Sequence, residues 1–345
     1  MCSAGRSALG YDVSYNRHSV EADRRIIVGF IEPHFLAGFS GGDKACCPGV
    51  IGIESILHDH AAPVIGDITS TSGRLEGNAT QTHVRAGGSL RPVDFLVNVT
   101  LNHHRAITRF FGGETLAAHR AGCAQVREAA RVPCPHAFPI AGTTPSGCPL
   151  DQNLSQAVKG RSAAAQIVRP GGFILAAARC NDGFPDHGSV RRLLLAHASA
   201  DAMLATLGVP GFREFNRGQV QRFALILKKA RVGLVSELPD ANVRRAHLTP
   251  VADLRRALDP ELARLGHDTS WPFSPRAPSL SPPSPVRPDG PDARNCLASS
   301  RAEPVARKSR AAWRTGRPVG ASSTSRDASA RTTRPKNPVA RSYFG

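Results

Sequence analysis

The sequence predicts an α/β protein with two α/β domains, an active site between them and a disordered C-terminal tail. Short β-branched strands alternate with amphipathic helices, the alternation restarts after a proline-containing break, and the periodicity ends near residue 268. A chain of 345 residues is long enough for two such domains. We expect a first, partial catalytic domain over residues 1–130, a second domain over 131–268 and the tail over 269–345.

The core of the first domain is expected to begin at a strand over residues 26–31. This run, Ile-Ile-Val-Gly-Phe-Ile, is apolar without alternation, which is typical of a strand buried on both faces. The first 23 residues of the chain are polar, and we expect them to be irregular and outside the core. The other elements expected in this domain are a glycine-rich turn (38–42), a helix (52–60), a strand (95–101) and an amphipathic helix (115–130).

Pro133 and Pro135 mark the expected boundary between the domains. After it, Asp151 is a candidate N-cap for a helix that runs to about Val168, and Pro170-Gly171-Gly172 is expected to end that helix. The elements expected later are a strand (173–178), a helix (220–229), a strand (232–235) and a closing helix (254–265).

The positive charge of the chain is concentrated in its tail. Residues 271–345 contain 14 Lys/Arg and 4 Asp/Glu, a balance of +10 out of the total of +17. Their Pro, Arg and Ser content cannot bury enough apolar surface to order them. A nucleic-acid-binding arm is one interpretation of this segment, and a non-native extension is the interpretation we prefer.

Composition also indicates where the protein works. The eight cysteines form no Cys-x-x-Cys pair, and the N-terminus lacks an apolar signal segment, so reduced thiols in the cytoplasm are expected. No apolar run approaches the roughly 20 residues of a membrane helix. We therefore expect no membrane and no nucleic-acid partner, and the sequence contains no feature that defines the oligomeric state.

The stretch from Glu32 to Gly49 carries the most chemistry. It places His34 at the end of the first strand, follows it with a loop containing Gly41 and Gly42, and then presents Lys44. Such a loop allows backbone N–H groups to approach a phosphate closely. The spacing is Gly-x-x-x-Gly-x-Lys without a following Ser or Thr, so it is not a nucleotide-binding P-loop.

Two further histidines follow, His58 and His60, and either could bind a metal through a neutral imidazole. Spacing alone does not choose between them. His103, His104 and His119 are expected to be structural or surface residues, and the Cys46-Cys47 pair is expected to pack beside the loop.

Together these motifs resemble the nickel-dependent lactate racemases and their relatives that act on other 2-hydroxy acids. The resemblance rests on the Glu-Pro-His and Gly-Gly-x-Lys strings, on His60, and on motifs of the same order further along the chain. These later motifs are Gly77-Asn78, the run Ala117-Ala118-His119-Arg120-Ala121-Gly122 and the run from Pro149 to Gly160.

The resemblance implies a function for individual residues. Lys44 would hold the nickel-pincer nucleotide, nickel pyridinium-3,5-bisthiocarboxylic acid mononucleotide, in a loop formed by Gly41 and Gly42. His60 would bind the nickel, and His34 would be one of two acid/base histidines. Gln156 and Lys159, on one face of a helix, would hold the carboxylate of the substrate. The implied partners are a small 2-hydroxy acid and the proteins that make the cofactor.

The chain also departs from the family pattern. The second acid/base histidine and a substrate arginine of the family lie upstream of the segment aligned here, and Ser155 stands where an aromatic residue is usual. We therefore expect an N-terminally truncated racemase with impaired activity. Two alternatives stay open: a zinc hydrolase or lyase that uses His34, His58 and His60, and a nucleic-acid-binding protein that acts through its tail.

Overall fold

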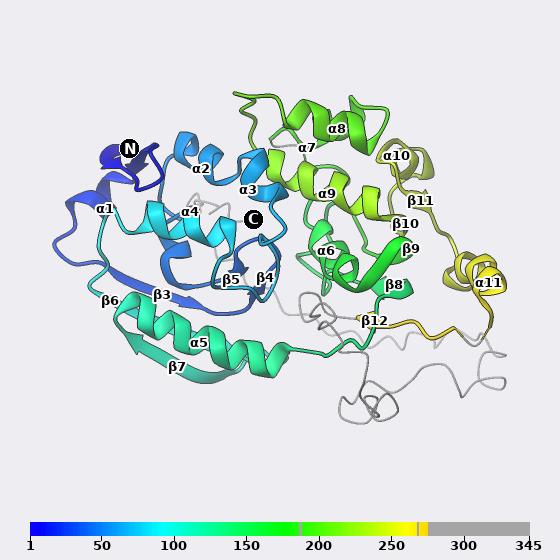
Figure 1. Cartoon of the computed structure of the whole chain (residues 1–345), viewed down its shortest axis with the longest axis horizontal. Coiled ribbons are helices and arrows are strands. Elements are labelled where there is room, and N and C mark those ends of the chain that lie inside the picture. The colour runs from blue at the N-terminus through cyan, green and yellow to red at the C-terminus, as the bar shows by residue number, and fades with distance from the viewer. Residues whose placement is uncertain (186–187, 268, 275–345) are drawn as a thin grey trace, which may run out of the picture. The chain divides into compact units, whose positions relative to one another are not determined.

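The N-terminal half of the chain is built on a three-stranded sheet of order β3-β6-β7 (Figure 1). β3 (Ile26–Phe30) pairs parallel with β6 (Phe95–Leu101), and β7 (Ile107–Gly113) pairs antiparallel with β6. The computed structural model describes residues 1–185, 188–267 and 269–274. The tail predicted over 269–345 lies outside the described residues except for 269–274, and there the prediction of disorder is wrong, because Phe273–Ser274 form the strand β12.

One face of this sheet is covered and the other is open. On the covered face, Ile27 and Leu96 are 6% and 0% exposed and pack beneath α5 (Thr115–Ala130), which runs beside β6 and β7 (Figure 1). On the opposite face of β3, Val28 is 76% exposed. The strand was predicted to be buried on both faces, and that prediction is wrong for the described residues, because none of them covers the second face.

The open face is apolar across all three strands. The register places the side chains of β3 that point to this face beside those of alternate residues in β6 and β7. Its exposed apolar residues are Ile26, Val28, Phe30, Phe95, Leu101, Ile107 and Phe110. We call this set the open sheet face.

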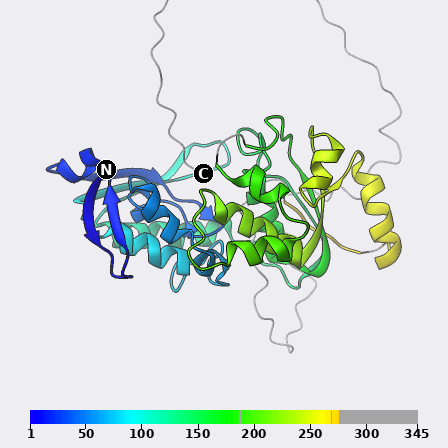
Figure 2. The ribbon, with the colours of Figure 1, turned by 90° about the horizontal axis from the view of Figure 1, so that it is seen from above.

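The first 23 residues are ordered, and the prediction that they are irregular was wrong. β1 (Cys2–Arg6) and β2 (Asp12–Tyr15) form an antiparallel pair, followed by the short helix α1 (Arg17–Glu21); the pair is the dark blue segment of Figure 2. Tyr15 is fully buried, and its hydroxyl donates to the Gly87 carbonyl over 2.7 Å. β2 is too short for its alternation to stand out in the sequence, although Val13 and Tyr15 both point inward.

Short elements connect β3 to β6 and carry the predicted glycine-rich turn. They are β4 (Pro33–His34), β5 (Gly38–Phe39), the 3-10 turn η1 (Gly42–Ala45), α2 (Ile53–Asp59), α3 (Ala62–Gly66) and α4 (Ala79–Gly88). The predicted helix over 52–60 corresponds to α2, and the predicted strand 95–101 and helix 115–130 are confirmed as β6 and α5.

The C-terminal half is built on a five-stranded, all-parallel sheet of order β11-β10-β9-β8-β12. Its strands are β8 (Phe138–Thr143), β9 (Val168–Ala177), β10 (Ala230–Val235), β11 (Thr249–Pro250) and β12 (Phe273–Ser274). Its helices are α6 (Val158–Ile167), α7 (Val190–Leu195), α8 (Ala200–Leu207), α9 (Arg217–Lys229), α10 (Asp240–Arg245) and α11 (Leu254–Leu265). The predicted strand 173–178 overlaps the second part of β9, and the predicted elements at 220–229, 232–235 and 254–265 are confirmed within α9, β10 and α11.

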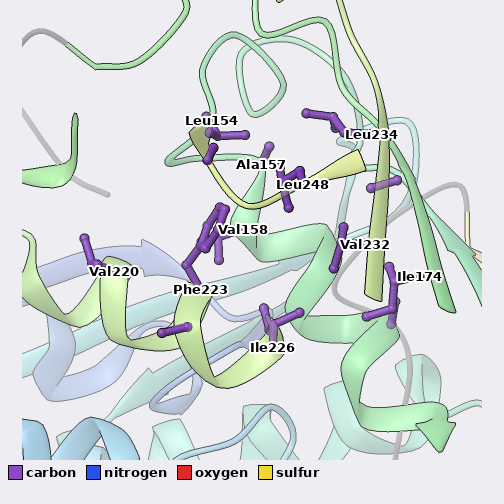
Figure 3. Packing of buried hydrophobic residues seen from close by; sticks show 14 of the residues in the cluster. Leu154, Ala157, Val158, Ile174, Val220, Phe223, Ile226, Val232, Leu234 and Leu248 are labelled. Atoms are coloured by element: carbon purple, nitrogen blue, oxygen red, sulfur yellow. The ribbon is translucent and has the colours of Figure 1, made fainter. Parts of the chain in front are cut away.

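Helices cover both faces of this second sheet, as parallel sheets require. On one face Ile174, Val232 and Leu234 pack against Val158 of α6 and Phe223 of α9 (Figure 3). On the other face Ile140, Phe173 and Leu175 pack against Leu258 of α11 and against Trp271. Alternate residues of β9 thus face the two different clusters.

In this half the predicted helix start at Asp151 and the predicted break at Pro170-Gly171-Gly172 were wrong, whereas the predicted helix end near Val168 is confirmed, since α6 ends at Ile167. α6 begins at Val158, whereas Asp151 lies in a series of turns, where its carbonyl accepts from the Cys180 N–H over 2.7 Å. β9 starts at Val168 and runs through Pro170-Gly171-Gly172, and within this run Gly172 pairs with Ala230 of β10. A register shift between β8 and β9 accommodates this irregular start.

The two sheets lie on either side of residue 131, but residues of both halves belong to one compact unit. The division into domains at 130/131 therefore stays a prediction. Among the described residues, none of the helices combines the length and hydropathy needed to span a bilayer.

Candidate active site

The glycine-rich loop takes a backbone path that only glycine accepts readily. Gly41 and Gly42 have φ angles of 79° and 58°, in the left-handed region. A Cβ on Gly41 would lie 2.5 Å from Oδ1 of Asn98, and a Cβ on Gly42 would lie 2.6 Å from Cγ of His119. Both glycines are therefore needed for close packing of the loop that leads to Lys44.

Asn98 and His119 support this loop from the covered face of the first sheet. Asn98 is fully buried in the central strand β6, and its Oδ1 accepts from the Gly42 N–H over 2.9 Å. His119 of α5 is 1% exposed, and its Nε2 donates to the Ser40 carbonyl over 2.9 Å. His119 is thus structural, as predicted, and the sequence analysis did not identify Asn98.

The electrostatics bring four of the predicted site residues together. Burial lowers the pKa of His34 well below its usual value of 6.5, and the nearby charges of Lys44, Lys159 and His60 lower it further. Burial also lowers the pKa of Lys44, with the Lys159 ammonium as the next cause. His34, Lys44 and His60 come from the first half of the chain and Lys159 from the second, so residues of both halves contribute to one group.

His34 is held in one tautomer by its own hairpin. It lies in β4, paired with β5, and its Nδ1 accepts from the N–H groups of Leu36 and Ala37 at 3.3 and 3.1 Å. A neutral ring with Nδ1 as an acceptor carries its proton on Nε2. The ring therefore presents an Nε2–H donor.

His60 is held in the opposite tautomer. It is the C-cap of α2, and its Nδ1 lies 3.1 Å from the Ile56 carbonyl oxygen, which can only accept, so Nδ1 carries the proton. Its Nε2 lone pair is then available, as a metal-binding imidazole requires. Burial lowers the pKa of His60, which keeps the ring neutral.

His58 does not join this group. Its ring stacks on Tyr11 at a centroid distance of 4.7 Å, and its Nε2 accepts from the Arg213 guanidinium over 3.1 Å. The lone pair of Nε2 is therefore in use. Of the two candidate metal ligands, His60 is the one whose Nε2 has no hydrogen-bond partner among the described residues.

Gln156 and Lys159 were predicted on one face of a helix, and this is only half right. Lys159 lies in the first turn of α6, whereas Gln156 lies in the preceding turn, where its N–H donates to Oδ1 of Asn153 over 2.9 Å. The Lys159 N–H donates to the Gln156 carbonyl over 3.1 Å, so the two residues remain neighbours. Burial lowers the pKa of Lys159, and Glu32 opposes that shift.

Glu32 is a site residue to which the sequence analysis gave no role. Part of its surface is exposed, yet desolvation by the surrounding protein raises the pKa of its carboxyl, and the charges of Lys159 and Lys44 offset part of that shift. Glu32 is two residues before His34 in an extended segment, a spacing that places both side chains on one side of the chain. That spacing is the signal that could have identified it.

A second missed residue, Asp59, connects the segments of Lys44 and His60. It is 1% exposed, and its carboxylate accepts from the Tyr11 hydroxyl and from the Cys47 thiol, both over 2.8 Å. Burial and the Asp59 charge raise the pKa of Cys47, so the thiol stays protonated and continues to donate. One buried carboxylate therefore links the N-terminal hairpin, the loop after Lys44 and the end of α2.

The described residues do not support a zinc site. A catalytic zinc needs three protein ligands. Within residues 1–185, 188–267 and 269–274, no group of three or more His, Cys, Asp or Glu side chains is placed to hold a metal ion.

Two family models match the chain. The model of the lactate racemase N-terminal domain matches residues 1–73, and that of the lactate racemase C-terminal domain matches residues 136–275. The first match begins at residue 1, in agreement with the ordered hairpin β1–β2.

Curated relatives and solved structures agree with these models. A lactate racemase from Lactiplantibacillus plantarum is 32% identical over 268 residues, 77% of this chain and 63% of that relative. A lactate racemase from Thermoanaerobacterium thermosaccharolyticum is 34% identical over 256 residues, 74% of this chain and 60% of that relative. The chain therefore spans less than two thirds of the length of these curated relatives.

The apoprotein structure of a lactate racemase from Thermoanaerobacterium thermosaccharolyticum superimposes with a TM-score of 0.78 at 30% identity, covering 82% of this chain and 68% of that one. A crystal structure of a Thermotoga maritima protein, 15% identical with a TM-score of 0.57, covers 76% of this chain and 67% of that one and shares the fold. From the two family models, the curated relatives and the first of these structures, the chain belongs to the lactate racemase family.

Proposed function

We propose that this chain contributes to the inversion of a small 2-hydroxy acid of the lactate type, with a nickel-pincer nucleotide attached to Lys44. Two observations support this proposal: Lys44 and Lys159, from the two halves, both lower the pKa of His34, and Arg217 of the second half donates to the His60 carbonyl over 2.9 Å. We also propose that the proteins that make the cofactor are partners and that the site works in the cytoplasm, where thiols such as Cys47 stay reduced.

The residues present fit the proposed cofactor. Lys44 has a lowered pKa, so more of its amine is unprotonated and able to form a covalent bond. His60 presents a free Nε2 for the metal. When bound, the nucleotide supplies the nickel and the carbon that accepts and returns a hydride.

The carboxylate of the substrate is assigned to Lys159 and Gln156. Lys159 is partly desolvated, so its ammonium interacts more strongly with a carboxylate than it would in water. Gln156, in the adjacent turn, adds an amide donor. Glu32 offsets the positive charge of Lys44 and Lys159 before the substrate binds.

His34 is assigned to the hydroxyl group of the substrate. In the tautomer observed, its Nε2–H donates a hydrogen bond to the substrate oxygen. To take the hydroxyl proton at Nε2, the ring must move its own proton to Nδ1, which means releasing the N–H groups of Leu36 and Ala37. We therefore propose that a shift of the 34–37 hairpin accompanies proton transfer.

The attachment of the cofactor can be tested without an activity assay. The chain is expressed with the cofactor-making enzymes of a lactate racemase system, and the intact mass is measured. Wild-type protein and Lys159→Ala should carry the mass of the nucleotide, whereas Lys44→Ala should not. An increment that survives in Lys44→Ala, or that is absent from the wild type, contradicts the proposal.

A further inference from the structure

The residue proposed to bind nickel is held by a helix from the other half of the chain. Arg217, the first residue of α9, is 6% exposed. Its Nε donates to the His60 carbonyl over 2.9 Å, and its Nη2 donates to the Leu57 carbonyl. Both carbonyls belong to the end of α2, where helix carbonyls lack partners within the helix. Arg217 therefore caps α2 with a cation, the favourable charge at that end.

The next residue, Gly218, contacts the His60 ring itself. A Cβ on Gly218 would lie 3.2 Å from Cδ2 of His60 and 3.4 Å from Cγ1 of Ile65. The ring therefore packs against the bare backbone of α9. Gly218 is the second residue of α9, and the absence of a side chain there leaves room for the ring.

These contacts fix the ring from several directions. The Ile56 carbonyl holds Nδ1, α9 limits the position of Cδ2, and Arg217 fixes the backbone carbonyl of the same residue. The opposite ring nitrogen, Nε2, is left unobstructed by these three contacts. Residues that orient a metal ligand in this way typically change metal affinity 10- to 100-fold when replaced.

We propose that Arg217 and Gly218 are positioning residues for His60, so that the metal site is complete only when the first turn of α9 lies against the C-terminal end of α2. This inference rests on the proposed function in one respect, the role of His60 as the metal ligand. The orientation of the ring by α9 is a separate statement about the protein without cofactor.

The test uses two variants and one matched control. Gly218→Ala moves the ring by adding a methyl group, and Arg217→Lys keeps the charge but cannot bridge both carbonyls. Gln221→Leu is the control, because Gln221 lies one turn further along α9 and its Nε2 donates to the Ala62 carbonyl and not to a group of His60.

The first measurement is nickel retention in full-length protein carrying the mass adduct on Lys44. Excess chelator should remove nickel about 10- to 100-fold faster from Gly218→Ala and Arg217→Lys than from the wild type. The adduct itself should remain, and Gln221→Leu should behave as wild type. Equal loss from all variants, or no loss from the first two, overturns the proposal.

The second measurement needs no cofactor. The ¹⁵N shifts of the His60 ring, assigned with His60→Asn, should show the Nδ1–H tautomer in the wild type and in Gln221→Leu. Gly218→Ala and Arg217→Lys should show a mixture with the Nε2–H tautomer. If the wild type binds no nucleotide, the proposed function fails, and this measurement alone decides whether Arg217 and Gly218 position His60. An unchanged His60 tautomer in both variants would then overturn the positioning role.

Discussion

Replacing Gly42 with alanine should destabilise the cofactor-free protein by about 2–5 kcal/mol. The left-handed φ of 58° costs an L-residue about 1–2 kcal/mol. The added methyl group would lie 2.6 Å from the His119 ring, and overpacking of this kind costs about 1–3 kcal/mol more. Because the His119 ring is buried and hydrogen-bonded to the Ser40 carbonyl, it cannot move aside freely.

Gly73→Ala is the matched control for this variant. Gly73 also has a left-handed φ, 77°, but a Cβ there would meet no atom within 4 Å. It should therefore lose only the backbone cost, about 1–2 kcal/mol. The difference between the two variants isolates the contact with His119.

Both free energies of unfolding can be measured by urea denaturation followed by circular dichroism. The yield of the Lys44 mass adduct should fall in Gly42→Ala and remain unchanged in Gly73→Ala, since only the first distorts the loop before Lys44. If Gly42→Ala loses no more stability than Gly73→Ala, His119 does not constrain the loop, and the account of its support is wrong.

Three further predictions concern pH, the open sheet face and catalysis. His34 and His60 have lowered pKa values in the folded protein, so the unfolded chain binds more protons once the pH falls below about 6.5, and the stability that the neutral rings contribute is lost below that pH. In urea titrations His34→Gln should lose less stability between pH 7 and pH 5 than the wild type, and an equal loss would contradict this prediction. Val28→Lys should change the free energy of unfolding by less than about 0.5 kcal/mol and reduce binding of a hydrophobic dye, whereas Ile27→Lys, on the covered face, should prevent folding. A large loss of stability in Val28→Lys would mean that the open sheet face is buried in solution. Loaded with cofactor, the chain alone should racemise lactate at least about 100-fold more slowly than the Lactiplantibacillus plantarum enzyme. Among the described site residues, His34 is the one imidazole besides the proposed metal ligand His60, and a positioned acid/base group contributes about 10²–10⁴ in rate. Comparable rates would show that another group serves the second face of the substrate.

Sequence patterns predicted the elements whose periodicity is long or strong. The helix over 115–130 and the helix over 254–265 each provide several turns of pattern, and both were placed correctly. The hairpin β1–β2 was missed because each strand has only four or five residues. The turns over 151–157 were taken as helix because Asp151 resembles an N-cap, a local signal that tertiary contacts with Cys180 override.

In the candidate site, too, the sequence predicted residues that share one local stretch and missed those that meet only in the fold. His34 and Lys44 lie on one short stretch of sequence, so their spacing and the family resemblance singled them out. Arg217 contacts His60 across 157 residues, and no local pattern records such a contact. Asp59 is adjacent to His60 in sequence, but its partners Tyr11 and Cys47 come from separate segments, so its role became visible only in the fold.

The aromatic residues give each half of the chain its own optical reporter. Tyr11 and Tyr15 are buried in the first half, next to the segments of Lys44 and His60, while Trp271 packs in the second half against the α11 side of the parallel sheet. The other tyrosine and tryptophan, Tyr343 and Trp313, lie outside the described residues and can be replaced. A single denaturation series read at the tyrosine and tryptophan wavelengths would then follow the two halves separately. Coincident transitions would mean that the contacts of α9 with α2 make them one cooperative unit, and separate transitions would give the stability of each half.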